Sequence, residues 1–77
     1  MVVSDGRLTA RLSDGEQGTF LWVANPCRCD VPVRIKLREP WSRLRPGTSV
    51  WGSQASWQDG LVELVAGARD VAIIPLC

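Results

Sequence analysis

A strict alternation of apolar and polar residues over residues 30–38 constrains the fold of this chain more than any other feature. The apolar positions of this segment are Val31, Val33, Ile35 and Leu37. Side chains two positions apart point to the same face of a β-strand, whereas a helix would scatter them around its circumference. The segment therefore predicts a strand with one buried face and one solvated face. Because Pro32 cannot donate to a sheet ladder, we expect an edge position or a bulge at that residue.

Turn signals at short intervals divide the rest of the chain into segments that are mostly too short for helices. The turn dipeptides are Asp5-Gly6, Asp14-Gly15, Asn25-Pro26, Pro46-Gly47 and Asp59-Gly60. The last of these lies between two short apolar segments and predicts a type I′ hairpin. The pattern predicts an all-β fold, a small antiparallel β-sandwich of about six to seven strands with Greek-key-like topology.

Further strands are expected on both sides of the alternating segment. Residues 7–13 alternate in the same way, with Leu8, Ala10 and Leu12 pointing inward. Residues 19–24 are apolar on both faces, which predicts a central strand covered on each side, with Trp22 in the core. Residues 71–76 predict the final strand.

Two segments are harder to assign from their residues. Residues 48–53, around Val50 and Trp51, predict a strand only weakly. Residues 39–47 lie around a pair of prolines and fit either an irregular loop or one short helical turn.

The length and composition favour one soluble domain with no nucleic-acid or membrane partner. Seventy-seven residues suffice for one domain, and a net charge of +1 gives no attraction to polyanions. No apolar run is long enough to span a bilayer. The cysteines Cys27, Cys29 and Cys77 are odd in number and are expected to be free thiols, which favours a reducing, cytoplasmic compartment.

The residues expected of an active site are missing. The chain has no histidine and no tyrosine, so the common triads and zinc sites lack their central residue. Its glycines sit singly in turns, which does not fit a phosphate-binding loop. The acidic residues fit turns or solvated strand faces better than a catalytic pair. We therefore expect no catalytic residue, no cofactor and no metal.

Four tryptophans are the compositional oddity of the chain. Trp41, Trp51 and Trp57 lie in or beside predicted turns and are candidates for sugar stacking or for contact with another domain. Burial in a thin core is the competing interpretation. A basic stripe of Arg34, Lys36 and Arg38 is expected to be a solvated strand face.

The sequence resembles the C-terminal β-domain of bacterial glycoside hydrolases of the β-galactosidase type. The resemblance rests on the stretch Leu-Trp-Val-Ala-Asn-Pro at residues 21–26, the alternating strand at 30–37, Val-Trp-Gly at 50–52 and the ending at 67–76. In that family the catalytic carboxylates belong to a separate (β/α)₈ barrel. The resemblance therefore implies an accessory domain without catalytic residues of its own.

These observations lead to two alternative expectations. The first is that residues 1–77 form a single β-sandwich domain, which is a C-terminal fragment of a larger glycoside hydrolase. This domain would stabilise the catalytic barrel domain or a homo-oligomer interface. The second is a carbohydrate-binding module that uses surface tryptophans.

Overall fold

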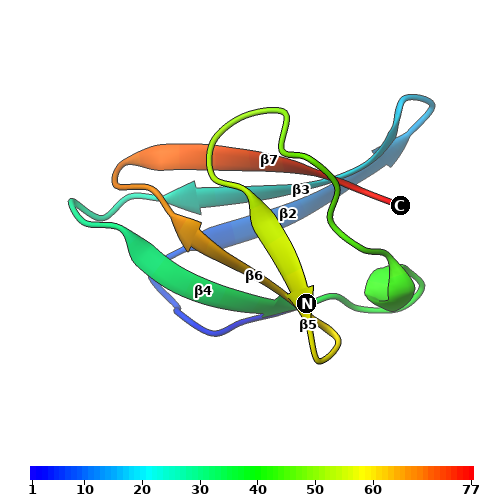
Figure 1. The fold of residues 1–77 in the computed structure, drawn as a ribbon, viewed down its shortest axis with the longest axis horizontal. Coiled ribbons are helices and arrows are strands. Elements are labelled where there is room, and N and C mark those ends of the chain that lie inside the picture. Colours follow the sequence, from blue (N-terminus) through cyan, green and yellow to red (C-terminus); the bar gives the residue numbers. More distant parts are fainter.

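The computed structural model describes all 77 residues and has two antiparallel sheets packed face to face (Figure 1). The elements are β1 (Val2–Val3), β2 (Thr9–Gly15), β3 (Gly18–Asn25), β4 (Val31–Lys36), the 3₁₀ turn η1 (Trp41–Arg43), β5 (Ala55–Gln58), β6 (Leu61–Ala66) and β7 (Asp70–Leu76). One sheet has the order β1-β4-β6-β5 and the other β2-β3-β7. The predicted small β-sandwich is confirmed.

The core lies between the sheets and is built from alternate positions of the strands. Its buried residues are Leu8, Leu21, Val23, Val31, Val33, Ile35, Leu37, Val62, Leu64, Ala66, Ala72, Ile74 and Leu76. All four aliphatic residues of the alternating segment 30–38 are among them, as predicted. Since one face of each strand is buried, a shift of one residue in register would expose its core side chains, and the pairing is therefore strongly specified.

The position of Pro32 follows from the shortness of β1. Strand β4 lies between β1 and β6, but β1 pairs only with residues 35 and 36. The N–H of Arg34 points to the β1 side and donates to Ser4 Oγ at 2.9 Å. The nitrogen of Pro32, two residues earlier, faces the same side beyond the end of β1. Strand β4 is therefore an interior strand and not the predicted edge strand, but no residue of β1 pairs with Pro32, so no ladder bond is lost.

Two hairpins differ in how well their turns were predicted. Between β5 and β6, Asp59 has a φ of 51° and Gly60 a φ of 79°, as a type I′ turn requires, so that prediction is confirmed. Between β2 and β3, Gly15 pairs with Gly18, and the turn is formed by Glu16 and Gln17. The predicted turn at Asp14-Gly15 is therefore two residues too early.

The segment before β5 is irregular but tied to the sheet. Residues 41–43 form the single 3₁₀ turn that was one of the two alternatives. The edge segment, residues 45–52, then runs along β7, with hydrogen bonds from Gly47 N–H to the Pro75 carbonyl at 2.8 Å and from Val50 N–H to the Ile73 carbonyl at 2.8 Å. It forms isolated bridges rather than a continuous strand. No helix is long and apolar enough to cross a bilayer.

The prediction that β3 is covered on both sides is wrong. Strand β3 is central in its sheet, between β2 and β7, and Leu21 and Val23 are fully buried. Trp22 points the other way and is 41% exposed, because no element packs over the outer face of the three-stranded sheet (Figure 1). Trp22 is therefore a surface residue and not part of the core.

Candidate binding face

The strand register places four side chains in one row across the three-stranded sheet. Trp22 on β3 lies opposite Arg11 on β2 and opposite Ile73 on β7. On the far side of β7, Ile73 forms a bridge with Trp51 of the edge segment. Directly opposed residues of antiparallel strands share a face. Arg11, Trp22, Ile73 and Trp51 therefore follow one another across the outward side of the sheet.

Neighbouring rows extend this surface with further apolar residues. Phe20 lies opposite Pro75, and Ala24 lies opposite Val71. We call the set Phe20, Trp22, Ala24, Val71, Ile73, Pro75 and Trp51 the outer face. Trp51 is 62% exposed and Val71 37%, so apolar side chains of both the edge segment and β7 contact solvent here, as Trp22 of β3 does. Surfaces of this kind commonly mark interaction sites in soluble proteins.

Both exposed indoles of the outer face are held by hydrogen bonds. Trp22 Nε1 donates to Ser13 Oγ at 2.9 Å. Trp51 Nε1 donates to Asp70 Oδ1 at 3.4 Å, and the same oxygen accepts the backbone N–H of Val71 at 2.8 Å. These contacts restrict the orientation of the rings before any partner binds, which lowers the entropy lost on binding.

Gly52 allows the edge segment to approach β7 beside Trp51. Its φ is +76°, and a Cβ atom at this position would lie 2.5 Å from the Val71 carbonyl oxygen and 2.9 Å from the Ala72 Cα. Only glycine avoids both the unfavourable φ and the backbone clash. The position of Trp51 on the outer face therefore depends on a glycine at position 52.

The three tryptophans singled out from the sequence do not form one site. Trp57 lies opposite Val62 and packs against the core. Trp41 lies in η1, where the guanidinium of Arg38 is 5.4 Å from its ring centroid. Of the three, Trp51 alone belongs to the outer face. On that face Ile73 separates Trp51 from Trp22, which was predicted to lie in the core.

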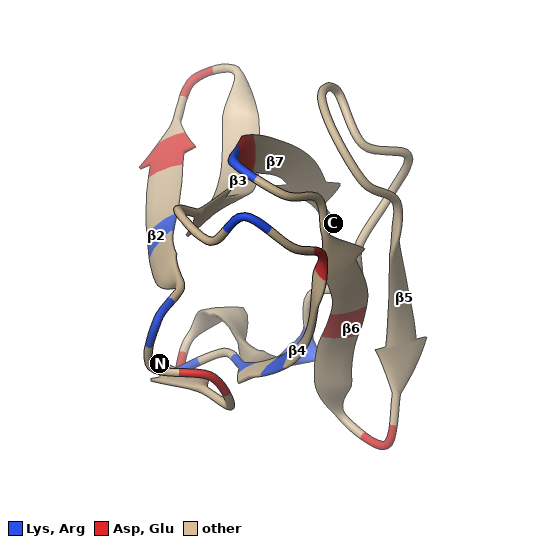
Figure 2. Cartoon of the chain, turned by 90° about the vertical axis from the view of Figure 1, so that its left-hand side faces the viewer, with Lys and Arg blue, Asp and Glu red and all other residues tan.

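The opposite surface of the sandwich is mixed, with Val2 and Val65 exposed on it beside charged side chains. The basic stripe of Arg34, Lys36 and Arg38 is exposed there, as expected. Arg34 Nε forms an ion pair with Glu63 at 2.9 Å, and both residues line a shallow depression of about 730 Å³. Figure 2 shows charged residues spread over several elements, while β3 and β5 carry none. Of the two sheet surfaces, the outer face is the one that exposes tryptophan side chains.

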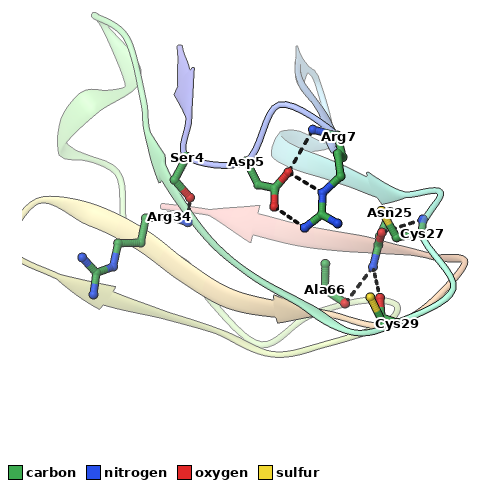
Figure 3. Close-up of polar contacts among 8 residues, drawn as sticks. All are labelled: Ser4, Asp5, Arg7, Asn25, Cys27, Cys29, Arg34 and Ala66. Carbon is green, nitrogen blue, oxygen red and sulfur yellow. Dashed lines mark hydrogen bonds and ion pairs between the residues drawn. The ribbon is translucent and has the colours of Figure 1, made fainter.

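Asn25 anchors the loop that crosses from the three-stranded to the four-stranded sheet (Figure 3). Its side chain is buried, and its Nδ2 donates to the carbonyls of Cys29 at 3.0 Å, Ala66 at 3.0 Å and Gly67 at 3.1 Å. Its Oδ1 accepts the N–H of Cys27 at 2.9 Å. The sequence identified Asn25 only as a turn residue, whereas the structure makes it the one buried polar side chain.

A second polar contact in Figure 3 joins Asp5 and Arg7. Asp5 accepts hydrogen bonds from Arg7 Nε at 3.0 Å, from an Arg7 terminal nitrogen at 2.7 Å and from the Arg7 backbone N–H at 3.0 Å. These bonds, the side-chain ones foremost, lower the pKa of Asp5 from 3.8 to about 2. The same pair raises the pKa of Arg7. Both groups lie at the surface and stabilise the turn after β1.

The side chains do not form a metal cluster. Cys27, Cys29 and Cys77 are free, and no three His, Cys, Asp or Glu side chains gather where they could hold a metal ion. Comparisons with protein-family models, curated proteins and solved structures find no match to this chain. The fold and the outer face together define a small β-sandwich module with one open, aromatic sheet surface.

Proposed function

We propose that this chain is a non-catalytic accessory β-domain of a glycoside hydrolase, similar to the C-terminal domain of β-galactosidase-type enzymes. In this proposal the outer face packs against the catalytic barrel domain and stabilises it. The observation that carries the proposal is the uncovered apolar surface of the three-stranded sheet, with Trp22 and Trp51 exposed. The sequence resemblance is the reason for proposing a catalytic barrel domain as the partner of this surface.

The exposed indoles offer a substantial driving force for packing. If a partner covered the remaining exposed surface of Trp22 and Trp51, roughly 250 Å² would leave water, which corresponds to about 6 kcal/mol before the losses of association. Polar side chains, including Arg11 and Asp70, lie at the margins of the outer face. An apolar centre with a polar rim is the usual composition of a protein interface.

The test uses the full-length product of the gene that contains this sequence. Its hydrolysis of nitrophenyl glycosides, β-galactosides first, is measured together with the temperature at which activity is lost. Trp22→Lys places a charge on the outer face, whereas Lys36→Glu changes a charge on the opposite surface and serves as the control. We expect Trp22→Lys to lower the inactivation temperature of the enzyme, while the melting temperature of the isolated 77-residue chain changes little.

Two outcomes would overturn the proposal. A gene product without glycosidase activity would show that this chain does not belong to a glycoside hydrolase. Equal thermal inactivation of the native protein, Trp22→Lys and Lys36→Glu would show that the outer face contributes nothing to the catalytic domain.

The row that contains Trp22 and Trp51 favours a second candidate, carbohydrate binding. The two residues are separated by two strand spacings, about 10 Å. Indole faces suit the apolar faces of pyranose rings, and a flat sheet surface leaves room for a chain of them. Tryptophan fluorescence titrated with oligosaccharides is the test, with Trp22→Ala and Trp51→Ala as variants and Trp57→Phe as the control facing the core. A saturable change that the control retains and both alanine variants lose supports binding, whereas no response at tens of millimolar, beyond the roughly millimolar range of weak sites, contradicts it.

A further inference from the structure

We propose that the β2 end of the outer face binds an acidic pyranose, with the sugar carboxylate on Arg11 and the ring on the indole of Trp22. This inference rests on the carbohydrate-binding candidate and names its class of ligand. The site is a notch of about 290 Å³ lined by Arg11, Leu12, Ser13 and Trp22. Its volume lies at the small end of ligand pockets, as a site for a single sugar ring requires.

The notch combines an apolar wall with fixed polar groups. Trp22 Nε1 donates to Ser13 Oγ at 2.9 Å, so the indole is oriented and the Ser13 hydroxyl hydrogen stays free to donate to a ligand. Ser13 and Arg11 are two residues apart on β2 and point to the same side as Trp22. A ring stacked on the indole would therefore have a hydroxyl donor and a guanidinium within reach.

The charge of the notch favours an anionic ligand. Arg11 is exposed and forms no ion pair, since the two ion pairs of the chain join Arg7 to Asp5 and Arg34 to Glu63. The nearest acid along β2, Asp14, accepts the hydroxyl of Thr19 at 2.9 Å in the hairpin. The guanidinium beside Trp22 thus keeps all its donors for a ligand. Arginine matches a carboxylate in a two-point geometry that a neutral hydroxyl does not reproduce.

The remaining residues of the row, Ile73 and Trp51, indicate the direction in which a longer ligand would extend from the notch. From the notch, Ile73 and then Trp51 continue across the sheet. Trp51 is oriented by Asp70, so a carboxylate lies beside the far indole, whereas a guanidinium lies beside Trp22 in the notch. An oligosaccharide would therefore lie with its acidic ring at Arg11 and a neutral ring near Trp51.

The experiment titrates the 77-residue chain with uronate oligosaccharides and follows backbone amide shifts and tryptophan fluorescence. The panel contains oligomers of galacturonate, mannuronate and glucuronate-substituted xylan, each compared with its methyl-esterified form, which keeps the sugar rings and removes the charge. We expect an acidic form to bind about tenfold more tightly than its ester, because a charge-assisted hydrogen bond is lost. Added salt should reduce the difference.

Variants separate the contributions of charge and stacking. Arg11→Gln should lose the preference for the acid and retain the affinity for the ester, while Lys36→Gln, which removes a positive charge from the opposite surface, should change neither. Trp22→Ala should abolish both, with its melting curve checked to show that it is folded. Amide shifts should be largest in β2 and β3.

The outcomes distinguish this inference from the candidate function on which it rests. Equal binding of acid and ester would overturn the inference and leave carbohydrate binding standing. No binding of any saccharide would overturn both. Equally strong binding of a polyglutamate peptide would also overturn the inference, because it would show attraction by charge without recognition of the sugar ring.

Discussion

Replacing the buried amide of Asn25 is expected to destabilise the fold more than any other exchange of a polar side chain. Asn25→Ala removes contacts with four backbone groups: Nδ2 shares its two hydrogens among three carbonyl oxygens, and Oδ1 accepts one N–H. Water can reach the partly buried carbonyls of Cys29 and Gly67, so each lost bond there costs about 1 kcal/mol or less. The bond to the Ala66 carbonyl is buried, and an unpaired carbonyl there costs about 1 to 3 kcal/mol.

The sum of these losses is about 2 to 5 kcal/mol, against a total stability of about 4 to 12 kcal/mol for a chain of this length. Urea unfolding followed by tryptophan fluorescence measures the difference. Gln54→Ala is the matched control, because Gln54 is also an amide but is exposed and accepts one bond, from Ser49 N–H at 2.9 Å. We expect it to cost less than about 1 kcal/mol.

Asn25→Asp tests the same reasoning by charge. A carboxylate at this position would keep the acceptor for Cys27 N–H but would face three carbonyl oxygens without a donor. We expect strong destabilisation at neutral pH that lessens as the pH falls, because protonation restores one donor. If Asn25→Ala costs no more than Gln54→Ala, or if the stability of Asn25→Asp is independent of pH, the argument from the buried hydrogen bonds is refuted.

Two further predictions concern the turn after β1 and the edge segment. Because the pKa of folded Asp5 is about 2 and its ordinary value is 3.8, its contribution to stability is present above pH 4 and is lost as the pH falls toward 2. An NMR titration of the carboxyl carbon should show this midpoint in the native protein and one near 3.8 in Arg7→Gln; an unchanged midpoint in the variant would contradict the assignment. Gly52→Ala should lower the free energy of unfolding by roughly 3 kcal/mol, through backbone strain and the clash with β7. Gly60→Ala, with a similar φ but open space around it, should lose only about 1 kcal/mol, and equal losses in the two variants would show that the clash is relieved.

The sequence predicted best where one face of a strand is apolar and the other is charged. In β4 the two faces differ so clearly that fold class, burial and orientation all follow from the alternation. Asp59-Gly60 was equally informative, because few residues tolerate two successive positive φ angles. In these places local chemistry and tertiary structure agree.

The errors arose where both faces of a strand are apolar. In β3 the residues on the two sides of the sheet cannot be distinguished by hydrophobicity, so nothing marked Trp22 as the side left open. The partnership of Trp22 with Trp51 depends on the pairing of β7 with two distant segments, which no local pattern encodes. The same holds for Asn25, whose partners Ala66 and Gly67 lie at the far end of the chain.

The pairing of β3 with β7 also determines when the chain can fold during synthesis. Strand β3 pairs with β2 at once as a local hairpin, but its other edge waits for residues 70–76, the last strand of this sandwich to be synthesised. Until then, the stretch from Phe20 to Val23 presents apolar side chains on both faces and an unpaired edge, which is the kind of segment that associates with other nascent chains. Non-local pairing of this kind typically completes in milliseconds to seconds. We therefore expect the yield of soluble protein to depend on translation speed and on chaperones that bind short apolar segments.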